Sequence, residues 1–191
     1  MKLRISHLHG IYDDHTGADL CELFCVPEHE SYKELFESGW LPTTNGEWYQ
    51  SRSSRVKILP ISSRRKYELK KIEVSKIGDY KKIFEESKSL YPIRVIDDIN
   101  VAISYPHEIY YFNNSVVSIV SVFDNIPFIS ATFGGRLRKD GITPMTVYYH
   151  LNRLIGNTYD YLYIAEWYSQ FNYKSNFPNF EWWNGEKWIK K

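Results

Sequence analysis

Hydrophobic positions are most concentrated in the middle of the chain, where they follow the pattern of β-strands. β-branched and aromatic residues fill 109–112, 116–123 and 126–133, and Asn113-Asn114 marks a turn between the first two runs. Short apolar runs bounded by turn residues predict strands that pair with their neighbours along the chain. Further strands are expected at 2–5, in 46–61 after the turn pair Asn45-Gly46, at 101–104, at 161–167 and in a hairpin at 182–188.

Other segments carry the start and stop signals of helices. Ser31 is a suitable N-cap, Glu34 completes a capping box with it, and Gly39 is a suitable stop. The remaining helices are expected over 77–91 and from Thr143-Pro144 to Gly156-Asn157. Strands and helices in this order predict an α/β (α+β) fold in which helices flank a mixed sheet, with a small N-terminal α/β segment.

Composition and charge narrow the class of protein. The chain has 43% hydrophobic and 25% charged residues, which is ordinary for a globular protein, and a high aromatic content of 17%. The net charge of +1 gives no general attraction to polyanions, so RNA contact requires a local basic patch and no DNA partner is expected. The chain contains no apolar run of membrane-spanning length and no signal-peptide core, so we expect a cytoplasmic protein without a membrane partner.

The pattern of elements changes near Pro92. We therefore expect an N-terminal α/β region with a basic hairpin over 1–91 and a catalytic region over 92–191. One continuous domain is the alternative to this division.

The last third of the chain carries the most specific motif. Tyr163-Ile164-Ala165-Glu166-Trp167-Tyr168 has the pattern of a strand that ends in polar and aromatic residues, and Phe171-Asn172-Tyr173-Lys174-Ser175-Asn176-Phe177 follows as a turn that presents one lysine among aromatics. Together with Trp188, this stretch resembles the arginyl-/leucyl-tRNA–protein transferase family. The signature of that family is a Tyr-Leu-Gly-Tyr-Trp-Ile-like strand end, then Met-x-Tyr-Lys-x-x-Phe and a C-terminal tryptophan. Ala165 stands where the signature has glycine, and Glu166 where it has tyrosine.

The resemblance implies an N-acetyltransferase-like fold and a transfer reaction. Members of the family move an amino acid from its tRNA to the N-terminus of an acceptor protein. The implied partners are therefore tRNA and an amine of a protein, peptide or small molecule, with aminoacyl-tRNA as co-substrate and no further cofactor. We expect Glu166, Tyr168, Tyr173 and Lys174 to act in catalysis at the reaction cleft, and Trp167, Phe171 and Phe177 to line the substrate pocket.

The residue types allow this chemistry. Transfer from an activated ester requires a positioned amine, a group that accepts or relays its proton, and a donor for the carbonyl oxygen. Glu166 and the nearby tyrosines can supply these groups. A structural interpretation is equally open, because Glu166 can face solvent or pair with Lys174, and Tyr173 and Phe171 can belong to the core.

Two basic stretches are candidates for contacts with the phosphates of tRNA. The loop between Gly134 and Gly141 supplies Arg136, Arg138 and Lys139. The denser stretch contains Arg52, Arg55, Arg64 and Arg65, followed by further lysines. Cations interleaved with Tyr49 and Tyr67 suit an RNA end, and the alternative is a solvated charged face.

Other functions also fit parts of the sequence. An acyl-CoA-dependent N-acetyltransferase needs free backbone N–H groups for a pyrophosphate at the start of the helix after this loop, where Pro144 removes one. A non-enzymatic adaptor would bind RNA or protein through its aromatic surface. Cys21 and Cys25 are weak candidates for a metal site, because their spacing also suits two small apolar residues, and no metal is expected.

Overall fold

The computed structural model forms two compact units, which we describe separately. It describes the backbone of residues 2–13, 18–43, 46–90, 99, 102–136, 139, 141–166 and 169–191, without the side chains of 2–22, 166 and 169–172. The terminal unit comprises Met1–Lys57 and Tyr163–Lys191, and the central unit comprises Ile58–Leu162. No helix within the described residues combines the length and the apolar character that crossing a bilayer requires.

The central unit is built on an antiparallel sheet with the strand order β9-β8-β7-β6. Its strands are β6 (Val74–Ser75), β7 (His107–Phe112), β8 (Val116–Phe123) and β9 (Ile126–Gly134). Asn113, Asn114, Asp124 and Asn125 have positive φ angles of 45° to 72° in the two hairpin turns. Asn and Asp tolerate this conformation, so the local sequence sets both turns.

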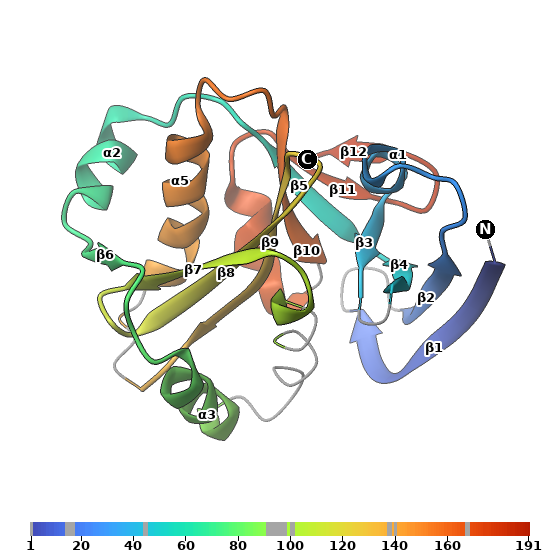
Figure 1. The fold of residues 1–191 in the computed structure, drawn as a ribbon, viewed down its shortest axis with the longest axis horizontal. Coiled ribbons are helices and arrows are strands. Elements are labelled where there is room, and N and C mark those ends of the chain that lie inside the picture. The colour runs from blue at the N-terminus through green and yellow to red at the C-terminus, as the bar shows by residue number, and fades with distance from the viewer. Residues whose placement is uncertain are drawn as a thin grey trace. The chain divides into compact units, whose positions relative to one another are not determined.

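Helices cover both faces of this sheet. α3 (Tyr80–Leu90) packs on one face, where Ile83 joins a buried cluster with Val117 and Ile119 of β8. α5 (Ile142–Leu154) packs on the opposite face. Ser118 of β8 points to this face and contacts His150 of α5, because successive side chains alternate along a strand. Figure 1 shows α3 and α5 on opposite sides of β7 and β8, with the short helix α2 (Ser63–Leu69) beside α5.

The terminal unit contains one complete small sheet and four further strands. The small sheet has the order β1-β2-β4-β3, and the other strands have the order β12-β11-β5-β10. The strands are β1 (Lys2–Asp13), β2 (Ala18–Val26), β3 (Trp40–Pro42), β4 (Trp48–Gln50), β5 (Ser53–Lys57), β10 (Tyr161–Glu166), β11 (Phe180–Trp183) and β12 (Trp188–Lys190). The unit also holds helix α1 (Tyr32–Glu37) and the 3-10 helix η2 (Ser169–Asn176).

Several sequence predictions are confirmed. The fold is a mixture of helices and mixed sheets, as expected. Ser31 caps α1 in a capping box with Glu34, and Gly39 follows the helix with a φ of 77°. The strand at Leu3 and Ile5 lies at a sheet edge, and the C-terminal hairpin pairs Trp183 with Trp188.

The strand expected at 101–104 is wrong, because residues 102–104 are helical. Ile99 and Ala102 are both buried in the cluster around Ile83. A short apolar run fits either a helix or a strand, and packing in this cluster decides between them.

The start of the third expected helix also differs. α5 begins at Ile142 after Gly141, whose φ is 83°, so Thr143 is a helical residue rather than the cap. The Thr146 hydroxyl donates to the Thr143 carbonyl at 2.8 Å inside the first turn. The domain division expected at residue 92 stays a prediction, because 91–98 lie outside the described residues.

Candidate functional site

The end of β10 is the most distorted piece of backbone in the predicted site. Ala165 has a φ of 58°, a left-handed conformation that a residue with a Cβ seldom adopts. The carbonyls on either side of this distortion accept hydrogen bonds from side chains. Lys174 Nζ donates to Ile164 O at 2.6 Å, and Ser54 Oγ donates to Ala165 O at 2.6 Å. The backbone is therefore distorted immediately before Glu166, the last residue of β10, and side chains bind the carbonyls of Ile164 and Ala165.

Lys174 is an internal group of the terminal unit. It lies on η2 and is only 8% exposed. A buried ammonium is stable only when hydrogen bonds replace its hydration, and the Ile164 carbonyl supplies one of them. Lys174 thus acts as a positioning residue that ties η2 to the end of β10.

The aromatic residues after Lys174 differ in their surroundings. Phe177 is 4% exposed, which places it in the core. Tyr173 is half-buried and meets Phe177 edge to face, with 6.3 Å between ring centroids. Phe177 therefore packs against Tyr173 within the core and does not present its ring to a substrate.

Arg55 of β5 forms a second built cluster in the terminal unit (8% exposed). Its Nε and Nη2 lie 2.8 and 2.7 Å from Glu181 Oε2, and Nη1 lies 3.4 Å from the Tyr163 hydroxyl. The guanidinium also stacks 4.0 Å from the centroid of the Trp188 ring. Its charge is therefore used inside the unit, which weakens the expectation that it binds RNA phosphates.

The other predicted phosphate contacts lie at the surface. Arg52 stacks 5.5 Å from the Trp182 ring centroid, and Arg136 and Lys139 are exposed on the loop after β9. Arg64 and Arg65 lie on α2 and both bind the Glu68 carboxylate.

The backbone of the loop after β9 already binds a carboxylate. The Arg136 N–H donates to Glu86 Oε2 at 3.0 Å, and a Cβ at Gly135 would come within 2.4 Å of the same oxygen. A side chain at position 135 would therefore have to move the Glu86 carboxylate away from the loop. A pyrophosphate at this N–H would have to displace a like charge, which disfavours the acyl-CoA alternative.

Some predictions fall outside the described residues or side chains. These are the side chains of Glu166, Phe171 and Cys21, and all of Trp167, Tyr168 and Arg138.

The described cysteine does not have the properties of a metal ligand. Cys25 of β2 is 1% exposed, and burial raises the pKa of its thiol to about 11. A thiol that stays protonated at neutral pH is a poor ligand, because metals bind the thiolate. Within the part of the chain that the structure describes, no group of His, Cys, Asp and Glu side chains gathers as a metal ion requires.

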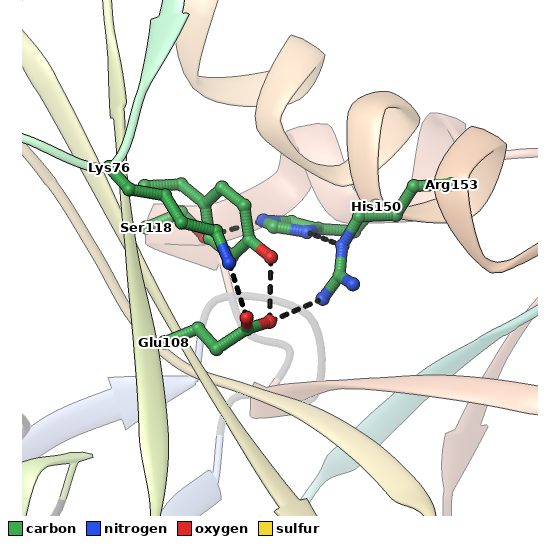
Figure 2. A network of polar contacts seen from close by, with 6 residues as sticks. Lys76, Glu108, Ser118, His150 and Arg153 are labelled. Atoms are coloured by element: carbon green, nitrogen blue, oxygen red, sulfur yellow. Dashed lines mark hydrogen bonds and ion pairs between the residues drawn. The ribbon is translucent and has the colours of Figure 1, made fainter.

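A polar network that our sequence reasoning missed crosses one face of the central unit (Figure 2). Glu108 of β7 is its centre. The carboxylate accepts from Lys76 Nζ at 2.5 Å and from the Tyr110 hydroxyl at 2.6 Å, and Arg153 Nη2 lies 3.5 Å away. Lys76 and then Tyr110 hold the pKa of the Glu108 carboxyl below its usual value, so it is ionised at neutral pH.

Arg153 connects this carboxylate to a buried histidine. Its Nε–H donates to His150 Nδ1 at 3.1 Å, and His150 Nε2 lies 3.1 Å from Ser118 Oγ. Because arginine only donates, Nδ1 carries no proton and the neutral ring is protonated at Nε2. His150 therefore donates to Ser118 and cannot act as the base that would activate it as a nucleophile.

Burial, and secondarily the Arg153 charge, lower the pKa of His150 well below its usual value. The network is consequently a fixed structural clamp between α5 and the sheet. The spacing of His150 and Arg153 on one helical turn, and of Glu108 and Tyr110 on one strand face, is the signal that could have indicated it.

The central unit also has a shallow pocket of about 210 Å³ at the start of α3. Its lining includes Gly78, Lys82 and Asn114 together with the carboxylates of Asp79 and Glu86. Its charges are mixed, and nothing within the described residues marks it as the site of a particular ligand.

A scan against protein-family models matches none, and a search of curated proteins finds no significant match.

Proposed function

We propose that this protein is an aminoacyltransferase that moves an amino acid from aminoacyl-tRNA to an amine of a protein, peptide or small molecule. The observation that carries the proposal is the end of β10. Ala165 is held in a strained conformation, and Lys174 and Ser54 fix the two carbonyls beside it. Strain that neighbouring groups hold in place is typical of functional sites, and here it immediately precedes Glu166-Trp167-Tyr168.

The proposed reaction forms one bond and breaks one. The acceptor amine attacks the ester carbonyl of the aminoacyl-tRNA, an amide C–N bond forms, and the ester C–O bond breaks. The amine gives up a proton, and the terminal ribose hydroxyl of the tRNA leaves with one. Glu166 is the group that accepts or relays this proton, and Tyr168 and Tyr173 donate to the carbonyl oxygen. Lys174 positions η2 and does not touch the reacting atoms.

The experiment described below also distinguishes two other functions. In an acyl-CoA-dependent acetyltransferase the donor would be acetyl-CoA. The hydrogen bond from the Arg136 N–H to Glu86 disfavours binding of its pyrophosphate at this loop. A non-enzymatic adaptor would bind RNA or protein without chemistry. An enzyme that uses charged tRNA works where translation occurs, so we expect a cytoplasmic location.

The experiment is incubation of the full chain with charged total tRNA and a peptide pool, followed by mass spectrometry of the peptides. A parallel reaction contains acetyl-CoA in place of tRNA. We expect peptides heavier by one aminoacyl residue in the first reaction and no acetylated peptides in the second. Glu166→Gln should reduce the transfer by roughly a hundredfold, as is typical for loss of a general base.

The proposal is wrong if no amino acid yields a modified peptide, or if acetyl-CoA alone serves as donor. Equal transfer by wild type and Glu166→Gln would remove Glu166 from the mechanism. Glu108→Gln is the matched control, since it removes a carboxylate that we place in a structural network, and it should retain transfer activity.

A further inference from the structure

Helix α2 presents an exposed basic face. All of its residues lie at or near the surface, and none is buried. Between residues 64 and 71 the sequence has five cations and one carboxylate, although the whole chain has a net charge of only +1. The positive charge of the protein is therefore concentrated on this short helix and the turn after it.

The arginines and the lysines of α2 have different surroundings. Arg64 Nε lies 3.1 Å from Glu68 Oε1, and Arg65 Nη1 lies 2.6 Å from Glu68 Oε2. Arg65 also stacks 4.7 Å from the Tyr148 ring centroid of α5, so this side of α2 packs on α5. Lys66 and Lys70 lie four residues apart, are exposed, and form no ion pair with any described residue.

An aromatic ring lies beside these lysines. Tyr67 is 62% exposed, and Lys71 Nζ lies 4.2 Å from the centroid of its ring. Lys66, Tyr67 and Lys70, the C-cap of α2, fall within one face of a helical projection, and Lys71 follows in the turn after the helix. We call these four residues the α2 basic face.

We propose that the α2 basic face binds the backbone and an unpaired base of the donor tRNA. Exposed lysines neutralise phosphates, and an exposed tyrosine ring stacks on a base that is not held in a duplex. Duplex DNA hides its bases inside the stack, and an acidic protein offers phosphate-like charge without a planar base. A membrane would require a broad apolar face, which the seven residues of α2 lack.

This inference rests on the proposed function for the identity of the RNA, but not on its chemistry. It also narrows the sequence prediction, which named Arg64 and Arg65 within a basic stretch that includes these lysines and Tyr67. We now assign the RNA contact to Lys66, Tyr67 and Lys70, because Glu68 already engages both arginines.

The test measures binding of unacylated bulk tRNA to the full chain by fluorescence anisotropy, over a series of KCl concentrations. Lys66→Gln/Lys70→Gln should make the slope of log K against log salt shallower by about 1.5, as expected for two lost phosphate contacts. Tyr67→Leu should weaken binding about tenfold, whereas Tyr67→Phe should bind like the wild type because it keeps the ring.

The matched control is Lys81→Gln/Lys187→Gln, which removes the same charge from exposed positions outside α2. All substitutions lie at exposed positions, and thermal unfolding confirms that each variant is folded. The proposal is overturned if both lysine pairs change the slope equally, if Tyr67→Leu binds tRNA like the wild type, or if polyglutamate of equal charge displaces tRNA as well as unlabelled tRNA does.

Failure of the proposed function gives a different result. Unacylated tRNA cannot donate an amino acid, so its binding is measured without any reaction. Binding through α2 without detectable transfer would contradict the proposed transferase activity and support the RNA contact at α2. Transfer that is insensitive to the α2 variants would contradict the RNA contact at α2 and support the transferase activity.

Discussion

Single buried polar residues in this protein are stabilised by short, specific contacts. Lys174 and Ser54 bind the carbonyls at the end of β10, Arg55 binds Glu181, and His150 lies between Ser118 and Arg153. Each contact satisfies a group whose burial would otherwise be costly. Substitutions at these residues therefore test whether a side chain stabilises the fold or takes part in a reaction.

Replacing Lys174 with Met keeps an unbranched side chain that is one heavy atom shorter and removes the donor to Ile164 O. We expect a loss of about 2 kcal/mol in the free energy of unfolding, because a buried carbonyl loses that partner. Urea unfolding at neutral pH measures it. Lys187→Met, at an exposed position, should change stability by less than about 0.5 kcal/mol. Equal effects at the two positions would contradict the positioning role.

His150 predicts a loss of stability at acidic pH. Its pKa in the folded protein lies well below the unfolded value of about 6.5. Below about pH 6.5 the unfolded chain therefore binds a proton that the folded protein rejects, and stability falls as the pH falls, by up to about 1.4 kcal/mol per pH unit. Urea unfolding between about pH 7.5 and pH 5.5 measures this slope.

His150→Gln is the control for that measurement, because it cannot titrate in this range. Its stability should depend less on pH than that of the wild type, while the other histidines contribute equally to both. Parallel pH profiles for the two proteins would mean that His150 is protonated in the folded state.

At the scale of elements, the ends of helices and strands agree best with local sequence signals. Ser31 and Glu34 start α1, Gly39 follows it, and pairs of Asn and Asp form the two turns around β8. Residues 102–104 are helical where a strand was predicted, and Ala102 is buried in the cluster around Ile83. Short apolar segments fit either a helix or a strand until their packing partners are known.

A methyl group added at Gly39 should lower the free energy of unfolding substantially. It has a φ of 77°, and a Cβ there would lie 2.4 Å from atoms of the Trp183 ring. Gly39→Ala should therefore cost both backbone strain and overpacking, together roughly 3 kcal/mol. Thermal unfolding followed by circular dichroism measures the change.

Gly156→Ala is the matched control for that substitution. Its φ is 84°, but a Cβ there would meet nothing within 4 Å, so only the backbone term of about 1 kcal/mol remains. If the two substitutions destabilise equally, the contact between Gly39 and Trp183 does not limit the site.

At the scale of the whole molecule, the two units carry different spectroscopic signals. All six tryptophans lie in the segments of the terminal unit, at positions 40, 48, 167, 182, 183 and 188. The longest described helices, α3 and α5, lie in the central unit. Tryptophan fluorescence thus reports on the terminal unit, while helical circular dichroism reports mainly on the central unit.

Ile119→Ala should therefore affect the two signals differently. Ile119 is fully buried in the central unit, and its truncation should cost about 2 to 5 kcal/mol there. We expect the urea midpoint from circular dichroism at the helical band to fall further than the midpoint from fluorescence. Equal shifts of the two midpoints would show that both units unfold in one transition.

The sequence by itself determined the class of fold, most strands, the cap of α1 and the turns around β8, because these depend on residues close together in the chain. It also indicated the segment around Lys174 and the basic stretch at α2 as places of interest. Only the tertiary structure decided what those side chains touch. Lys174 is buried against Ile164, Arg55 against Glu181, and Glu86 occupies the loop N–H that a phosphate would need. The His150 network likewise joins β7, β8 and α5, since contacts between residues far apart in sequence arise only when the chain packs.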